Sequence, residues 1–160
     1  MKKIGTTVLA LLFNVFLLTA QVVTPAEEII KSWEKHKEME STSIFKYLQW
    51  RSIGPISQGG RVESIVGVPG DPSIVYVGIG SGGVWKTENA GASWTPIFDE
   101  QPTVAIGDIE VGVNNPDLVW VGTGESLLSK TSFPGIGVFK SIDGGETWEH
   151  KGLADSQHIM

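Results

Sequence analysis

The amino-acid sequence predicts an all-β protein built from four-stranded units that repeat along the chain. Twenty glycines and eight prolines stand among 160 residues, of which only 19% are charged. This composition is typical of short strands joined by tight turns. From residue 47 onward, β-branched and aromatic runs alternate with clusters of glycine, proline, asparagine and aspartate, which is the pattern of strands and turns. The length allows about one ordinary domain.

Two parts of the chain are similar to each other. Residues 72–80 match residues 116–124 at an offset of 44, and residues 83–94 match residues 137–148 at an offset of 54. The difference between the two offsets indicates an insertion of ten residues in the second copy, at about residues 125–134. We interpret the insertion as an extended loop.

Each copy contains four candidate strands. Those of the first copy cover residues 62–68, 74–78, 83–87 and 94–97, and the second copy runs from residue 106 to 151. A four-stranded unit of about 44 residues in tandem is typical of a β-propeller blade. The sequence therefore predicts a partial propeller of antiparallel blades over residues 47–160, with blades at about 61–97 and 105–151.

A partial third copy lies before the first blade. Residues 50–53 resemble the last strand of the first copy, residues 94–97, and no inner strands accompany them. We interpret this segment as an orphan outer strand that would complete the final blade of a closed ring. Because a ring takes about four to eight blades, we expect the remaining blades in a longer chain, and we expect this chain alone to be unstable. Assembly of the ring from several copies is the alternative.

The first twenty residues have the pattern of a secretory signal peptide. Lys2 and Lys3 precede an apolar run that ends at the small residue Ala20. The run is shorter than the roughly 18 residues of a membrane span, which disfavours the alternative of a transmembrane anchor. The chain has no cysteine, which excludes disulfides, a lipid-attached cysteine and thiolate metal sites. We expect an exported bacterial protein, located outside the cell, in the periplasm or at the cell surface.

A lead-in segment at residues 21–46 separates the signal from the repeats. Residues 25–40 predict a short amphipathic helix, with Ile29, Ile30 and Trp33 on one side and glutamates on the other. We expect this helix to lie on the main domain. Binding of a partner protein is the alternative.

The charged residues argue against a nucleic-acid partner, the histidines argue against a metal site, and we expect no cofactor. Twelve Lys and Arg face eighteen Asp and Glu, giving a net charge of −6, and the two arginines are Arg51 and Arg61. A surface that tracks phosphates needs a basic patch. The histidines, His36, His150 and His158, lack metal-ligand spacing.

Each copy also carries a turn with the pattern Ser/Thr-x-Asp/Asn-x-Gly-x-Ser/Thr-Trp. The pattern consists of Thr87, Asn89, Gly91, Ser93 and Trp94 in the first copy, and of Ser141, Asp143, Gly145, Thr147 and Trp148 in the second. It resembles the Asp-box, or BNR repeat, of sialidases, sortilins and related propellers. There the turn is structural: a short polar side chain caps backbone N–H groups, glycine takes a positive φ, and tryptophan packs between blades.

The resemblance extends over most of the chain, to about residue 153. Residues 50–55, 59–62, 122–125 and 137–141 are similar to secreted bacterial propellers described as sortilin-like or glycosyl hydrolase-like. It implies an exported, non-catalytic module that binds protein, peptide or glycan ligands through its loop faces. The alternative is a glycoside hydrolase whose catalytic carboxylates lie mostly in missing blades. A photosystem-assembly-type propeller shares the blade pattern and is a third possibility.

Three known chemistries fit the sequence poorly. Residues 78–83 satisfy G-x-G-x-x-G, but a strand follows instead of the helix that a dinucleotide site needs. A sialidase needs an arginine cluster to hold a carboxylate, and the chain has two arginines. In the turn that resembles the catalytic turn of xyloglucanase propellers, Gly80 stands in place of the aspartate. The sequence identifies no catalytic residue.

Three residues remain as candidates for ligand binding, namely Arg61, Asp108 and Glu125. Arg61 opens an innermost strand and Glu125 opens the insertion, and the loops at the ends of innermost strands usually carry function. The alternative is that each is a solvated turn charge or part of an internal salt bridge. The insertion also carries Leu127, Leu128 and Phe133, which either form a contact surface or pack over the blade.

Overall fold

A computed structural model describes residues 23–49, 51, 60–126 and 132–160 of the chain. The predicted signal peptide and nearly all of the predicted outer strand at residues 50–53 lie outside these described residues. So do Leu127 and Leu128 of the insertion.

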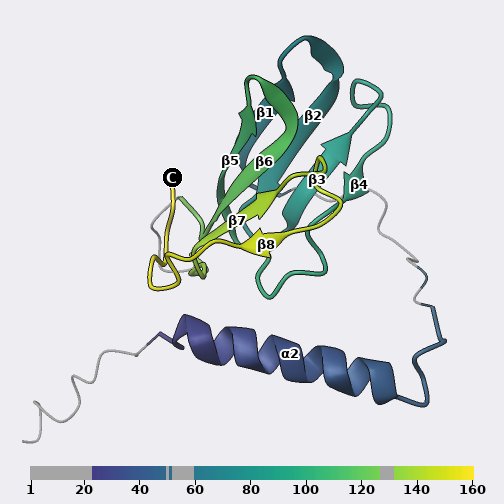
Figure 1. The fold of residues 1–160 in the computed structure, drawn as a ribbon, viewed down its shortest axis with the longest axis vertical. Coiled ribbons are helices and arrows are strands. Elements are labelled where there is room, and N and C mark those ends of the chain that lie inside the picture. The colour runs from purple at the N-terminus through teal and green to yellow at the C-terminus, as the bar shows by residue number, and fades with distance from the viewer. Residues whose placement is uncertain (1–22, 50, 52–59, 127–131) are drawn as a thin grey trace, which may run out of the picture.

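Two four-stranded antiparallel sheets make up the main body (Figure 1). In each sheet the strands are paired in the order of the chain. Blade 1 consists of β1 (Val62–Val68), β2 (Asp71–Ile79), β3 (Gly83–Thr87) and β4 (Thr95–Pro96). Blade 2 consists of β5 (Ile106–Gly112), β6 (Asn115–Thr123), β7 (Val138–Ser141) and β8 (Glu149–His150). The predicted all-β fold class is confirmed.

The two blades have the same internal register. Val62 pairs with Ile79 in blade 1, and Ile106 pairs with Thr123 at the same place in blade 2. Both innermost strands carry an irregularity directly after these pairs, which is a β-bulge position. The repeat seen in the sequence is thus a repeat of strand geometry.

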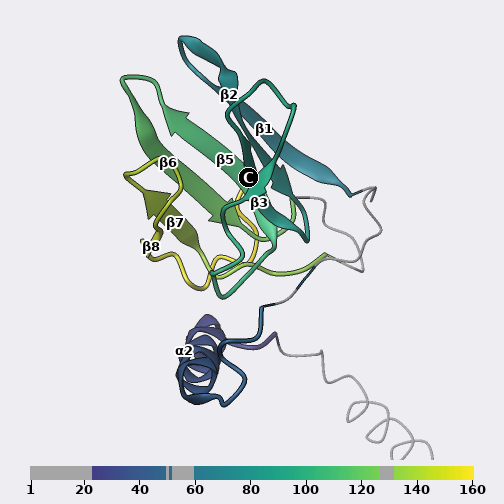
Figure 2. The ribbon, with the colours of Figure 1, turned by 90° about the vertical axis from the view of Figure 1, so that its right-hand side faces the viewer.

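The blades pack face to face, with the two innermost strands, β1 and β5, next to each other (Figure 2). The core between them contains buried side chains from both sheets, among them Tyr76 and Phe98 of blade 1 and Val121 and Phe139 of blade 2. The rings of Phe98 and Phe139 meet edge to face, with centroids 5.2 Å apart, a favourable aromatic geometry. Two consecutive meander sheets packed in this way form part of a β-propeller.

A glycine on β2 allows the close approach of the two blades. An added Cβ at Gly78 would lie 2.7 Å from Cγ2 of Ile106 and 3.1 Å from Cδ1 of Ile109. Any larger residue would push β5 away, because protein interiors leave no spare volume. Gly78 therefore fixes how deeply the aliphatic side chains of β5 seat against blade 1.

Two side chains lock the outer parts of the blades together by binding the main chain of the neighbour. The hydroxyl of Tyr76 donates to the carbonyl of Gly144 at 3.0 Å, and Nε1–H of Trp148 donates to the carbonyl of Ile97 at 2.8 Å. Both Gly144 and Trp148 belong to the second of the two turns that resemble Asp-boxes. The turn of one blade is therefore held against the strands of the blade before it.

The helix α2 (Ala26–Thr42) lies across one end of the two blades (Figure 1). Ala26 is buried in the core cluster, and Ile29 and Ile30 pack against that cluster. Further along the helix, Lys37 Nζ pairs with Glu100 Oε2 at 3.3 Å on an exposed surface. The apolar side of α2 thus faces the main domain. Within the described ranges, no helix is long and apolar enough to cross a membrane.

Candidate functional site

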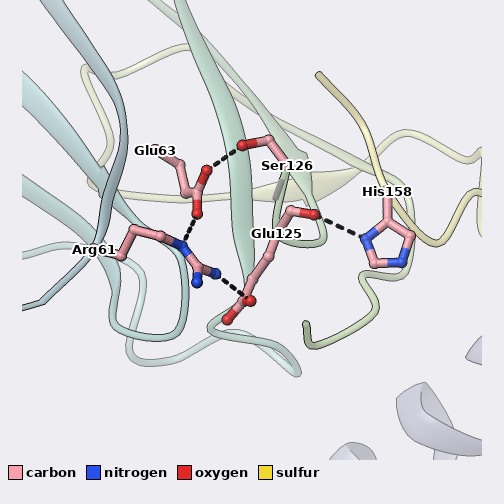
Figure 3. Close-up of polar contacts among 5 residues, drawn as sticks. All are labelled: Arg61, Glu63, Glu125, Ser126 and His158. Atoms are coloured by element: carbon pink, nitrogen blue, oxygen red, sulfur yellow. Dashed lines mark hydrogen bonds and ion pairs between the residues drawn. The ribbon is translucent and has the colours of Figure 1, made fainter. Parts of the chain in front are cut away.

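Arg61 and Glu125 lie together where the start of β1 comes close to the end of β6 (Figure 3). The guanidinium of Arg61 donates from Nη2 to Oε2 of Glu125 and from Nε to Oε1 of Glu63. Arg61 stands directly before β1, Glu63 is the second residue of that strand, and Glu125 follows β6. The fold thus brings together groups from both blades around one arginine.

Two further residues complete this group, which we call the Arg61 cluster: Arg61, Glu63, Glu125, Ser126 and His158 (Figure 3). The hydroxyl of Ser126 donates to Oε2 of Glu63. Nδ1 of His158 lies 2.9 Å from the backbone carbonyl of Glu125, and it donates there because a carbonyl accepts only. Ser126 thus holds the carboxylate of Glu63, and His158 holds the backbone of Glu125.

The cluster combines a buried carboxylate with a partly exposed cation. The side chain of Glu125 is 3% exposed, whereas that of Arg61 is 39% exposed. A buried carboxylate needs a partner to remain charged, and Arg61 supplies it. Among Arg61, Glu63 and Glu125, the side chain of Arg61 is the most exposed to solvent.

The hydrogen bonds of the cluster favour its charged forms. The hydroxyl of Ser126, followed by the guanidinium of Arg61, lowers the pKa of Glu63 against the opposing effect of burial. Hydrogen bonds to Glu63 and then to Glu125 raise the pKa of Arg61. Glu63 is therefore an ionised acceptor at neutral pH.

Asp108 lies apart from the Arg61 cluster. Its Oδ1 accepts a hydrogen bond from the hydroxyl of Ser64 at 2.7 Å and one from the backbone N–H of Ile109 at 2.9 Å. The bond from Ser64 joins the two innermost strands, since Ser64 belongs to β1 and Asp108 to β5. Of the three candidates from the sequence, the structure thus brings Arg61 and Glu125 together and leaves Asp108 in an interstrand contact.

Sequence reasoning missed Glu63, Ser126 and His158. Glu63 stands two residues after Arg61, a spacing that places side chains on the same side of a strand, and this spacing was the signal that could have found it. His158 is distant from the rest of the cluster in the chain and makes its contact through a main-chain carbonyl. Spacing offers no signal for such a contact.

A cavity of about 460 Å³ lies near the Arg61 cluster, and none of the five cluster residues lines it. Its lining includes the aromatic rings of Trp33 and Phe133 and the polar side chains of Ser81 and Gln101. Ser81 follows Gly80, whose added Cβ would lie 3.1 Å from Nη2 of Arg61, and the carbonyl of Phe133 accepts from the N–H of Glu125 at 3.1 Å. Phe133 is exposed, so part of the predicted insertion borders this cavity.

The turns that resemble Asp-boxes close on themselves through side-chain hydrogen bonds. Oδ1 of Asn89 accepts from the N–H of Ser93 at 2.8 Å, and Oδ1 of Asp143 accepts from the N–H of Thr147 at 2.9 Å. Gly91 has a φ of 89°, a conformation in which glycine is favoured. In each turn the first hydroxyl, that of Thr87 or Ser141, accepts from the glycine N–H.

The carboxyl of Asp143 is strongly acidic within this turn. Hydrogen bonds from the hydroxyls of Ser141 and Thr147 and from the backbone N–H of Thr147 lower its pKa from 3.8 to about 2.

Within the described ranges, acidic residues and histidines form no group of three that could hold a metal ion.

Comparisons with known proteins find likeness at the level of solved structures. No family model and no curated protein matches the chain. An ancestral GH74 enzyme matches with a TM-score of 0.47 and 19% identity over 61% of this chain and 14% of that protein. YCF48 from Cyanidioschyzon merolae matches with a TM-score of 0.43 and 20% identity over 62% of this chain and 29% of that protein. The GH74 xyloglucanase from Xanthomonas campestris matches with a TM-score of 0.41 and 15% identity over 57% and 15%. The chain thus spans less than a third of the length of each.

Proposed function

We propose that the chain is part of an exported β-propeller, sortilin-like in kind, that binds a protein, peptide or glycan ligand at the Arg61 cluster. The observation that carries the proposal is the pairing of the partly exposed side chain of Arg61 with the buried carboxylate of Glu125 where the two blades meet. The cluster stands at the end of an innermost strand, where propellers usually carry function. The proposal treats the cluster as a preorganised binding surface.

The chemistry of a ligand follows from the groups that the cluster offers. Contacts with described residues use two of the five N–H groups of Arg61. A planar guanidinium binds oxygen pairs, as in carboxylates and vicinal hydroxyls. Trp33, Phe133 and Asp99 are among the residues that line the nearby cavity. Because two carboxylates already pair with Arg61, the hydroxyls of a glycan or the backbone carbonyls of a peptide fit the remaining N–H groups better than a further carboxylate does, and the experiment below separates these ligands.

The state of Glu63 favours binding over glycoside hydrolysis. A glycosidase needs a carboxylic acid whose raised pKa lets it donate a proton, facing a second carboxylate. The pKa of Glu63 is lowered, and both Glu63 and Glu125 are tied to the same arginine. A glycoside hydrolase remains the alternative function, with its acid and base in other blades.

The test is a binding measurement on the secreted protein. Arrays of acidic glycans, neutral glycans and peptides are incubated with the wild type, with Arg61→Lys and with Lys151→Arg. The control is matched, because Lys151 also pairs with a glutamate and its side chain is 34% exposed. Arg61→Lys keeps the charge but loses the planar fork, so we expect about a tenfold loss of affinity, roughly 1.4 kcal/mol. The control should bind as the wild type does.

Three outcomes decide between the functions. Loss of glycan or peptide signal in Arg61→Lys alone supports the binding proposal and identifies the ligand class. Equal binding by both variants contradicts it. Release of reducing sugar from a bound glycan, unchanged in Arg61→Lys, favours the hydrolase with its catalytic groups elsewhere.

Export is part of the proposal and has its own measurement. Mass spectrometry of the protein recovered from the culture medium should find an N-terminus at Gln21, directly after the predicted signal peptide. An uncleaved N-terminus in the membrane fraction would instead support an anchor.

A further inference from the structure

The outward face of blade 1, which points away from blade 2, exposes apolar side chains. Val62, Ile65, Trp85 and Trp94 are all exposed, and Ile65 is 67% exposed. Together with Val77 and Ile79 they line a hollow of about 600 Å³. Exposed apolar surfaces of this kind mark interaction sites in soluble proteins.

The equivalent face of blade 2 is buried. The residues that correspond to the four exposed ones are Ile106, Ile109, Phe139 and Trp148, found by the offsets of 44 and 54 residues. The first three are at most 3% exposed, and Trp148 packs against the core cluster. Both faces are apolar. The face of blade 2 is buried because blade 1 covers it, whereas the corresponding face of blade 1 is exposed.

The covering surface has a defined composition. It contributes Tyr76, Gly78, Val84 and Phe98, all of which belong to the opposite side of blade 1. The glycine admits an aliphatic side chain of the neighbouring innermost strand, and the tyrosine hydroxyl binds the turn of the neighbour. Because the two blades repeat the same geometry, the face of blade 1 that contains Ile65 fits a blade with a glycine at the position of Gly78 and a polar aromatic residue at the position of Tyr76.

Blade 2 has such a surface, but its glycine is already occupied. Lys140 Nζ lies 5.3 Å from the ring centroid of Trp120, as Lys86 lies 5.7 Å from that of Tyr76. An added Cβ at Gly122 would lie 2.6 Å from Cγ2 of Ile159, as one at Gly78 would lie 2.7 Å from Ile106.

Ile159 therefore fills the position on blade 2 that Ile106 fills on blade 1. In a head-to-tail contact between two copies, Val62 of one copy would compete with Ile159 of the other for this position. The repeat thus argues against a second copy of the chain as the partner of the Ile65 face.

We propose that the Ile65 face, defined by Val62, Ile65, Trp85 and Trp94, is covered by a further blade of the same repeat type that belongs to the same polypeptide. That blade offers a glycine and a polar aromatic residue, and it continues the interface that joins blades 1 and 2. Ile159 takes the position from which the innermost strand of a following blade starts. The inference is independent of what the propeller binds.

A pair of matched substitutions tests whether the Ile65 face is covered. Both are made in the full-length protein, expressed in the cells that naturally produce it. Ile65→Asp places a charge on the proposed interface, and Ile142→Asp places the same charge at a residue that is 69% exposed. Ile142 should stay exposed when a blade follows, because its counterpart Glu88 has a side chain that is 69% exposed although blade 2 is present. Burying an unpaired charge is strongly destabilising. We expect Ile65→Asp to lower the melting temperature by at least about 5 °C or to abolish secretion, and Ile142→Asp to leave both unchanged.

Hydroxyl-radical labelling supplies a measurement that needs no variant. The native protein is oxidised, and the labelling of Trp85 and Trp94 is compared with that of the denatured protein. Exposed Met39 and buried Tyr76 serve as references within the same chain. We expect Trp85 to be protected to the degree of Tyr76, because its counterpart Phe139 is buried, and Trp94 to be protected more than Met39, because its counterpart Trp148 is half-buried.

The mass of the same native sample identifies the source of the covering blade. Protection in a monomer several times heavier than 17.2 kDa supports the proposal. Protection in an assembly of 17.2 kDa chains overturns it in favour of a second copy. Labelling of both tryptophans at the level of Met39, with equal stability of the two aspartate variants, overturns the covering itself.

Discussion

Gly78→Ala measures directly how closely the two blades approach each other. The new methyl group would stand 2.7 Å from Cγ2 of Ile106 and 3.1 Å from Cδ1 of Ile109. Carbon atoms in contact prefer about 3.5–4.0 Å, so the strands must separate by several tenths of an ångström or the isoleucines must leave their rotamers. Overpacking of this kind costs about 1–3 kcal/mol of unfolding free energy.

Gly67→Ala is the matched control for this change. Gly67 also lies in a strand of blade 1, and an added Cβ there meets no atom within 4 Å. Both alanines restrict the unfolded chain, which stabilises the protein by about 0.4–1 kcal/mol. That gain is common to the two variants, so the difference in their unfolding free energies isolates the steric term of about 1–3 kcal/mol.

Urea denaturation followed by tryptophan fluorescence measures this difference. We expect Gly67→Ala to unfold at the wild-type midpoint or slightly above it, and Gly78→Ala to unfold at a lower midpoint with an unchanged m-value. If the two variants unfold at the same midpoint, the blades do not pack against each other at β2 and β5 as described.

Three further predictions concern single contacts. Because the pKa of Asp143 is depressed, its ionised form stabilises the fold above about pH 4, and this stabilisation is lost as the pH falls through about 2. Asp143→Asn gives this turn the residue that the first turn has at Asn89. This variant should flatten the acid side of a plot of urea midpoint against pH. Tyr76→Phe removes the bond to the Gly144 carbonyl and should cost about 0.5–1.5 kcal/mol in the same denaturation assay. Lys37→Ala breaks an exposed pair and should change the unfolding free energy by less than about 1 kcal/mol, so a larger loss would show that this pair anchors α2.

The strands and blades could be predicted from the sequence because their signals are local. The β1 strand alternates and is β-branched, and it occupies Val62–Val68 as expected. The predicted third strand likewise matches β3 at Gly83–Thr87. The second strand is longer than the predicted residues 74–78, since β2 begins at Asp71. Aspartate is typical of turns, so the sequence pattern did not indicate a strand there. The fourth strand is shorter, with two paired residues in β4.

The composition of the candidate site could be predicted only in part. Arg61 stood out because it opens an innermost strand, and Glu125 stood out because it opens the insertion. Glu63 looked like an ordinary strand residue, although its spacing of two residues from Arg61 puts both side chains on one side of an extended chain. His158 binds a carbonyl, and contacts to main-chain atoms leave no pattern in the identity of the partner residue.

The contacts that lock the blades also bear on how such a protein can change. Tyr76 and Trp148 bind carbonyl groups of Gly144 and Ile97, and every residue type offers a carbonyl. A blade therefore recognises the path of its neighbour's backbone more than the identity of its side chains. Blades joined in this way can diverge in sequence, be duplicated or be exchanged, provided that the turn and the small residue on the second strand keep their geometry.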